Sequence, residues 1–178
     1  MPGPCAYRSS SAASASDASR FRTVERGSVE VSYPSDLEIV VTRQFHAPQQ
    51  LVFDVFTRPE LARRTIAPFG EEVKVCAIDL RVGGDYHYVF TPEGGPDCDF
   101  SGTYLEVDAP RRTSQTWRFG GWPGVEAVES IDLSEAAGIT TLVSTMAFQD
   151  RAGRDRMHTV DGLLANLDHI EDLLRDLT

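Results

Sequence analysis

Cysteine and lysine are scarce in this chain: it has three cysteines, Cys5, Cys76 and Cys98, and its single lysine is Lys74. An odd number of cysteines without Cys-x-x-Cys spacing does not indicate a disulfide framework or a zinc site. Incidental thiols in a reducing cytoplasm are the favoured interpretation. The sequence has no apolar run near the ~18 residues of a membrane span. It also has no apolar N-terminal segment typical of a secretory signal. We therefore expect a cytoplasmic protein.

Positive charge is also in short supply, because the 178 residues carry a formal net charge of −10. A general nucleic-acid binder needs a basic face to displace counterions, and an anionic membrane attracts basic segments. The composition therefore disfavours nucleic acid and membrane as partners. The motifs GxSxG, HExxH, GxGxxG and the P-loop are missing as well. We expect no metal and no cofactor.

Residues 1–34 differ in composition from the rest of the chain. Residues 9–19 are almost entirely serine and alanine, with one aspartate, and cannot bury enough apolar surface to order themselves. We predict a disordered extension over 1–34 and one ligand-binding domain over 35–178. A transit peptide is the alternative, because Arg8, Arg20 and Arg22 accompany the serines.

Alternating hydrophobicity predicts about seven strands in the remaining chain. The first begins near Leu37. A helix opening at Ala47-Pro48 and a short helix from Pro59 through Arg64 follow it. Six further strands are predicted at 71–81, 85–91, 98–107, 113–119, 125–133 and 139–149. Short links between them imply antiparallel pairing.

The last segment, 157–177, has helical instead of strand periodicity. Its apolar residues recur every three or four positions, with Asp161, Asp168 and Asp172 on the opposite face. Such a helix has to bury its apolar stripe, and the preceding sheet offers the only large surface. The predicted fold class is therefore α+β, with a curved antiparallel sheet around a long C-terminal helix. A pocket between them would bind a small molecule.

Four stretches of the sequence resemble a known family. They are the segment from Val41 to Pro48, the Asp79–Tyr86 hairpin with Gly83-Gly84, the strand pair from Phe100 to Phe119, and Gly138–Leu142 with the final helix. Together they resemble the START-like (SRPBCC) superfamily, in the branch related to the heat-shock protein 90 ATPase activator. The resemblance implies a helix-grip fold over the whole folded part. The segment 64–68 lacks the tryptophan that this branch has near the pocket mouth.

The resemblance leaves several functions open, since fold does not select among them. The first expectation is binding of a hydrophobic or aromatic small molecule, in secondary metabolism or stress response. The alternatives are a polyketide cyclase/dehydrase-type enzyme, an antibiotic self-resistance protein that sequesters a reactive product, and a protein-binding chaperone-activator module. Outward residues such as Thr113, Gln115 and Asp85 are polar, which counts against the last. The protein is expected to be a monomer or a homodimer.

Candidate ligand-binding residues follow from the faces of the predicted strands. Aromatic sets alternate onto one face, whereas His87 faces outward. Gly162 in the helix is compatible with either ligand space or close packing. His158, at the helix start, is the candidate acid or base. The predicted site is Tyr86, Tyr88, Phe90, Trp117, Phe119, Met146, Phe148, Met157, His158 and Leu163.

Overall fold

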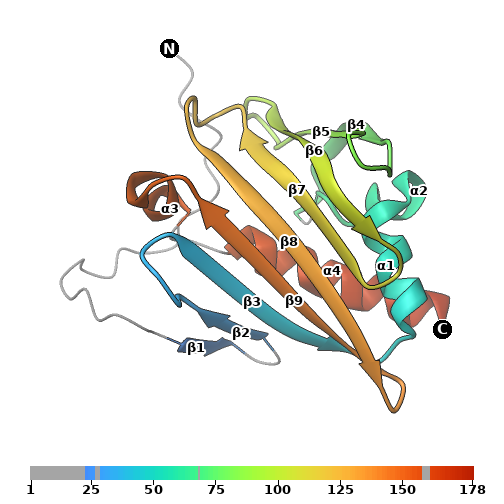
Figure 1. Ribbon diagram of the computed structural model, residues 1–178. Coiled ribbons are helices and arrows are strands. Elements are labelled where there is room, and N and C mark those ends of the chain that lie inside the picture. Colours follow the sequence, from blue (N-terminus) through green and yellow to red (C-terminus); the bar gives the residue numbers. More distant parts are fainter. Residues whose placement is uncertain (1–22, 27–28, 68, 158–160) are drawn as a thin grey trace.

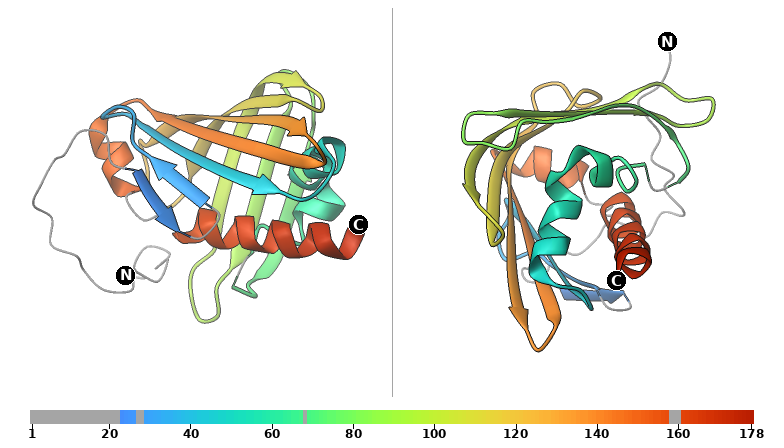
Figure 2. Two further views of the ribbon diagram at one scale, coloured as in Figure 1. Left: turned by 90° about the horizontal axis from the view of Figure 1, so that it is seen from below. Right: turned by 90° about the vertical axis from the view of Figure 1, so that its right-hand side faces the viewer.

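The computed structural model describes residues 23–26, 29–67, 69–157 and 161–178. A nine-stranded antiparallel sheet, in the order β1-β2-β3-β9-β8-β7-β6-β5-β4, curves over helix α4 (Figures 1 and 2). The strands are β1 (Thr23–Arg26), β2 (Val29–Ser32), β3 (Glu38–Phe45), β4 (Glu72–Ile78), β5 (Asp85–Thr91), β6 (Cys98–Asp108), β7 (Arg112–Phe119), β8 (Glu126–Ala136) and β9 (Ile139–Phe148). The helices are α1 (Gln49–Thr57), α2 (Pro59–Ala62), α3 (Arg151–Arg156) and α4 (Asp161–Leu177).

The seven predicted strands correspond to β3–β9, and the predicted helix-grip architecture is confirmed. α1 and α2 follow the first of these strands, as expected. Pro48 directly precedes α1 in an extended conformation, and Pro59 occupies the first position of α2, where its missing N–H leaves no helical bond unmade. Both short helices lie near the C-terminal end of α4 (Figure 2).

The N-terminal boundary differs from the prediction. β2 pairs with β3, and Val29 and Val31 are only 5% and 2% exposed within the hydrophobic core. The segment 1–34, expected to be a disordered extension, therefore contains the strands β1 and β2, and two buried valines offset the polar composition around them. Residues 1–22, which include the serine-rich stretch, lie outside the described residues, and the expectation for them stays a prediction.

The predicted C-terminal helix, 157–177, corresponds to α4, and a short helix that was not predicted, α3, precedes it. In α3, the Asp150 side chain accepts a hydrogen bond from the Gly153 N–H at 2.7 Å, and the helix ends at Arg156. α4 begins at Asp161 and turns its apolar stripe to the sheet, burying Leu167, Ile170, Leu173 and Leu174. None of the described helices has the length and apolar character needed to cross a bilayer.

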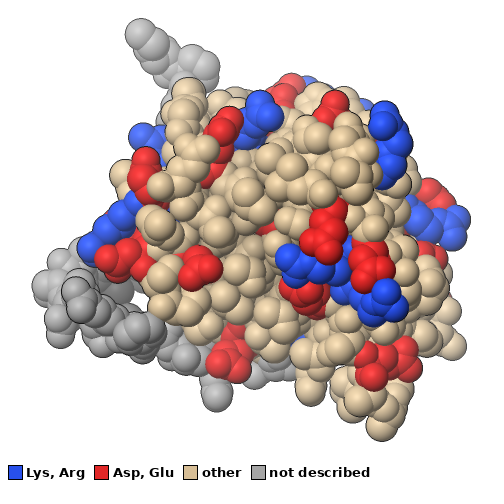
Figure 3. Space-filling model, in the orientation of Figure 1, with Lys and Arg blue, Asp and Glu red and all other residues tan. Residues whose placement is uncertain are grey.

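The outer face of the sheet carries both signs of charge (Figure 3). Arg112 on β7 pairs with Glu106 on β6 at 2.9 Å, and Arg118 lies 3.6 Å from Glu126. His87 also lies on this face, as predicted, with its Nε2 3.2 Å from the Asp99 carboxylate. Each of these basic side chains therefore has an acidic partner on the same face.

Candidate ligand pocket

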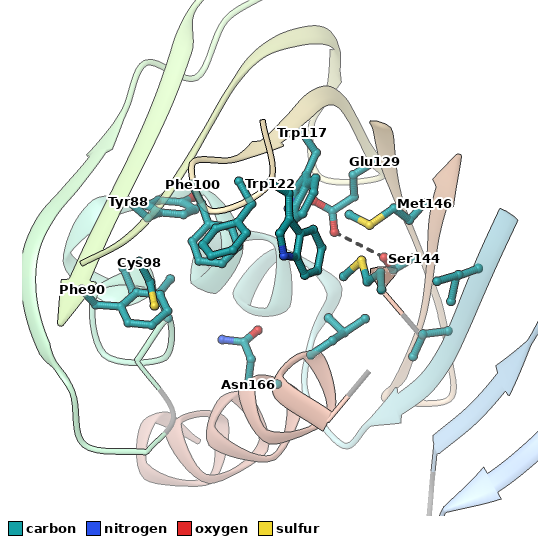
Figure 4. A pocket seen from close by; sticks show the side chains of 17 residues that line it. Tyr88, Phe90, Cys98, Phe100, Trp117, Trp122, Glu129, Ser144, Met146 and Asn166 are labelled. Atoms are coloured by element: carbon teal, nitrogen blue, oxygen red, sulfur yellow. Dashed lines mark hydrogen bonds between the residues drawn. The ribbon is translucent and has the colours of Figure 1, made fainter. Parts of the chain in front are cut away.

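A pocket of about 250 Å³ lies between the concave face of the sheet and the first turns of α4 (Figure 4). Its walls are largely aromatic because alternate residues of β5, β6 and β7 turn inward. Phe100 stacks on Phe90 and on Phe119, with ring centroids 5.7 Å and 4.8 Å apart. Trp122 packs edge-on against Phe119 at 5.1 Å. The rings that line the pocket are Tyr88, Phe90, Phe100, Trp117, Phe119 and Trp122.

Most of the predicted site residues meet at this pocket. Those that line it are Tyr88, Phe90, Trp117, Phe119, Met146, Met157 and Leu163. Gly162 lies in the wall too, at the start of α4. His158 lies outside the described residues, so its predicted acid–base role stays a prediction.

Tyr86 and Phe148 face the core but do not line the pocket. The Tyr86 hydroxyl donates a hydrogen bond to the Thr116 carbonyl at 3.1 Å, and its ring covers Gly102. A Cβ at Gly102 would lie 2.6 Å from the Tyr86 ring and 1.7 Å from the Thr116 carbonyl oxygen, so only glycine fits there. Phe148 packs against the edge of Trp117 at 6.5 Å. Both residues therefore support the pocket walls without lining the pocket.

A smaller pocket of about 120 Å³ adjoins the first and shares Ile66, Tyr88, Glu129, Leu163 and Asn166 with it. Its remaining walls are more polar, and we call it the polar chamber. Hydroxyl and amide groups reach it from β6, β7 and the α1–α2 region. The polar residues that line only this chamber are Thr57, Thr65, Tyr104, Thr113 and Gln115.

Glu129 on β8 is the acidic residue at the junction of the two pockets. Gln115 Nε2 donates a hydrogen bond to its Oε2 at 3.1 Å, and Ser144 Oγ donates to its Oε1 at 3.4 Å. No arginine, lysine or histidine among the described residues forms an ion pair with it. Burial raises the pKa of Glu129, and the two hydrogen bonds offset part of that rise.

The tyrosines around Glu129 are also affected by burial. Burial raises the pKa of Tyr88 and of Tyr104, and the nearby Glu129 charge raises both further. Both phenols therefore stay protonated at neutral pH and can donate or accept hydrogen bonds. Apolar rings with a few polar groups at one end are typical of a site for a small ring system.

The polar residues are the part of the site that the sequence analysis missed. Thr113 and Gln115, expected to point outward, are 4% and 9% exposed and face the chamber. Strand alternation from Trp117 and Phe119 was the available signal, since all four share one face of β7. Glu129 likewise alternates with the inward Ala127 and Ile131. Trp122 gave no such signal because it reaches the pocket from the loop after β7.

The connection after α2 forms the pocket border. It includes the segment 64–68, which lacks the tryptophan that the resemblance led us to expect there. Ile66 contributes to both pockets, and the Thr65 carbonyl accepts a hydrogen bond from Asn166 Nδ2 at 2.7 Å. This bond ties the connection to α4. An aliphatic side chain here takes less space than an indole would.

The two cysteines of the described chain differ in their bonding state. Cys76 is a free thiol, whereas Cys98 is disulfide-bonded, which corrects the expectation of incidental thiols only. Within the described ranges, no group of three or more histidine, cysteine, aspartate or glutamate side chains could hold a metal ion. The absence of a metal and of a cofactor stays a prediction.

Comparison with known proteins supports the fold. No curated protein matches the chain. A protein from Rhodobacter sphaeroides has a similar structure at 18% identity, with a TM-score of 0.78 over 84% of this chain and 99% of that one. A protein from Chromobacterium violaceum matches at 26% identity and a TM-score of 0.68, over 79% and 98%. An Hsp90 activator from Plasmodium falciparum matches at 20% identity and a TM-score of 0.50, over 62% and 72%.

A family model extends these likenesses to most of the folded chain. The model described as activator of Hsp90 ATPase homolog 1-like protein matches residues 46–175, from the turn before α1 to the last turn of α4. The match spans every element that forms the pocket except β3. The chain therefore belongs to the family of activator of Hsp90 ATPase homolog 1-like proteins, within the START-like superfamily.

Proposed function

We propose that this protein binds a flat hydrophobic or aromatic small molecule in the pocket between the sheet and α4. The observation that carries the proposal is the set of six aromatic rings around one space of about 250 Å³. This volume is slightly below the ~300–1,000 Å³ typical of ligand pockets. It suits a compact ring system better than a long lipid chain. Rigid aromatic walls lose little rotamer entropy when a ring slides between them.

Flavone, a flat apolar probe, tests this proposal. In a Trp122→Phe background, Trp117 is the only tryptophan, and flavone should quench its fluorescence with saturation. Calorimetric titration of the Trp117→Ala/Trp122→Phe variant should show binding lost, with the far-UV circular dichroism unchanged. Val128→Ala removes an exposed side chain of β8 and serves as a control that should bind normally. Unquenched Trp117 fluorescence would place any ligand site elsewhere.

Glu129 favours a second candidate, a cyclase/dehydrase-type enzyme. A carboxyl group whose pKa is raised by burial inside an apolar pocket is a candidate for proton transfer. In that case Glu129→Gln would keep ligand binding but lose turnover, because the amide holds the shape of the carboxyl and cannot exchange the proton. Product analysis of a bound polyketide-like substrate distinguishes the two: unchanged ligand after prolonged incubation supports binding alone.

A further inference from the structure

We propose that the ligand carries a protonated amino group, and that Glu129, Gln115 and Asn166 receive it in the polar chamber. The proposal deepens the proposed function and rests on it. The ring system of such an arylalkyl amine would occupy the aromatic pocket. Its amine would reach through the shared wall, where Glu129 and Asn166 border both pockets.

Gln115 provides the first observation, an acceptor without a donor. Its side chain is 9% exposed, and its Nε2 donates to Glu129. Its Oε1 is buried and has no hydrogen-bond partner. Buried polar atoms are nearly always paired, and leaving an acceptor unpaired costs free energy. A ligand N–H in the chamber would satisfy this oxygen.

Asn166 adds a second acceptor from the opposite wall. Figure 4 shows its amide pointing from α4 into the cavity. Its Nδ2 donates one hydrogen bond to the Thr65 carbonyl at 2.7 Å, and its Oδ1 can accept one from a ligand. The other polar groups of the chamber are hydroxyls, and those of Thr57 and Thr65 already donate to the Phe53 and Ala62 carbonyls. Glu129 and the amide oxygens of Gln115 and Asn166 therefore offer acceptors to a ligand that donates.

Charge selects an amine among the possible donors. Glu129 has no cationic partner among the described residues, and no arginine, lysine or histidine is part of either described pocket lining. An ammonium group would pair with the carboxylate and offset its desolvation, whereas an anionic ligand would meet like charge. Tyr88 lines both pockets, and an aromatic ring near a cation adds to the attraction.

Three probes that share one ring test the proposal: 2-naphthylmethylamine, 2-naphthylmethanol and 2-naphthoate, titrated calorimetrically into the full chain at pH 7. The amine should bind about tenfold or more tighter than the alcohol, because hydrogen bonds to a charged group are stronger than neutral ones. The carboxylate should bind weakest. In Glu129→Gln, the ratio of amine to alcohol affinity should fall to about one.

Two further variants make the result decisive. Glu126→Gln removes a carboxylate from the outer face of the same strand and should leave the ratio unchanged. Gln115→Leu removes the unpartnered acceptor and should lower the ratio severalfold, which tests the proposal even if Glu129→Gln does not fold.

The outcomes separate this proposal from the one on which it rests. Equal binding of all three probes, or an amine preference that survives in both Glu129→Gln and Gln115→Leu, would overturn the amine proposal and keep the pocket as a ligand site. If no probe binds, and flavone does not bind either, the proposed function fails together with it. Binding of flavone and not of any naphthyl probe would overturn the amine proposal alone.

Discussion

Glu129 lines the pocket, and its ionisation also affects the stability of the fold. Its raised pKa means that the folded state binds a proton there more tightly than the unfolded state does. The stability that this proton contributes is complete below the unfolded pKa, about 4.3 for glutamate. It is lost as the pH rises through the raised pKa of the folded state. At neutral pH an ionised Glu129 therefore lowers the free energy of unfolding.

Glu129→Gln should accordingly stabilise the protein at pH 7.5, because the folded state then no longer buries a charge at this position. The gain should be much smaller at pH 4, below the pKa of both states, because the side chain is then mostly neutral in each. Urea unfolding at the two pH values measures the difference, with Glu126→Gln as the exposed control. A gain of equal size at both pH values would show that ionisation is not its cause.

At the scale of elements, α4 holds the fold together. Leu167 and Ile170 are each 1% exposed, in contact with the inner face of the sheet and the core. Arg43 on β3 reaches the same helix, and its Nη1 donates to the Asp168 carboxylate at 2.6 Å. The helix is thus fixed by an apolar stripe and by an ion pair at its edge.

Leu167→Ala or Ile170→Ala should lower the free energy of unfolding by about 2–5 kcal/mol, through lost burial and the cavity left behind. Leu177, at the end of the same helix, is 42% exposed, and Leu177→Ala should cost little. Urea unfolding of the three variants checks this. Small losses at both buried positions would mean that the helix adds little to the core.

For the whole molecule, β2 extends the sheet beyond the predicted start of the domain, and β1 pairs with its other edge. β2 covers the free edge of β3 and places Val29 and Val31 in the core. Without it, the N–H and C=O groups on that edge of β3 would be unpaired, which is the usual template for association between sheets. The domain thus depends on a strand within the segment expected to be a disordered extension.

Deletion of residues 1–34 should therefore lower the thermal midpoint by several degrees, at about 2–4 °C for each kcal/mol lost. The full chain with Val29→Ala and Val31→Ala separates the burial of these side chains from the rest of the segment, and it should lose part of the same stability. Glu30→Ala, exposed on the same strand, is the control. Unchanged midpoints for both the deletion and the double variant would make β2 dispensable.

The sequence by itself determined the seven strands β3–β9, the two short helices and the aromatic inner face. Alternation and helical spacing are local properties, and glycine and proline end elements locally. Short links between successive strands then make them antiparallel neighbours. Strand alternation alone therefore assigns four aromatic residues to one pocket: Tyr88, Phe90, Trp117 and Phe119.

Only the tertiary structure decided which polar residues enter the pocket and where the domain starts. A glutamate or glutamine in a strand is typical of a solvated face, and Glu129 and Gln115 become pocket residues only when α4 covers the sheet above them. The alternation of Val29 and Val31 is too short to predict a strand. These residues form one because β2 pairs with the edge of β3. Trp122 reaches the pocket through a loop whose path depends on packing against Phe119. In each case the deciding contacts join residues far apart in sequence, which local periodicity does not encode.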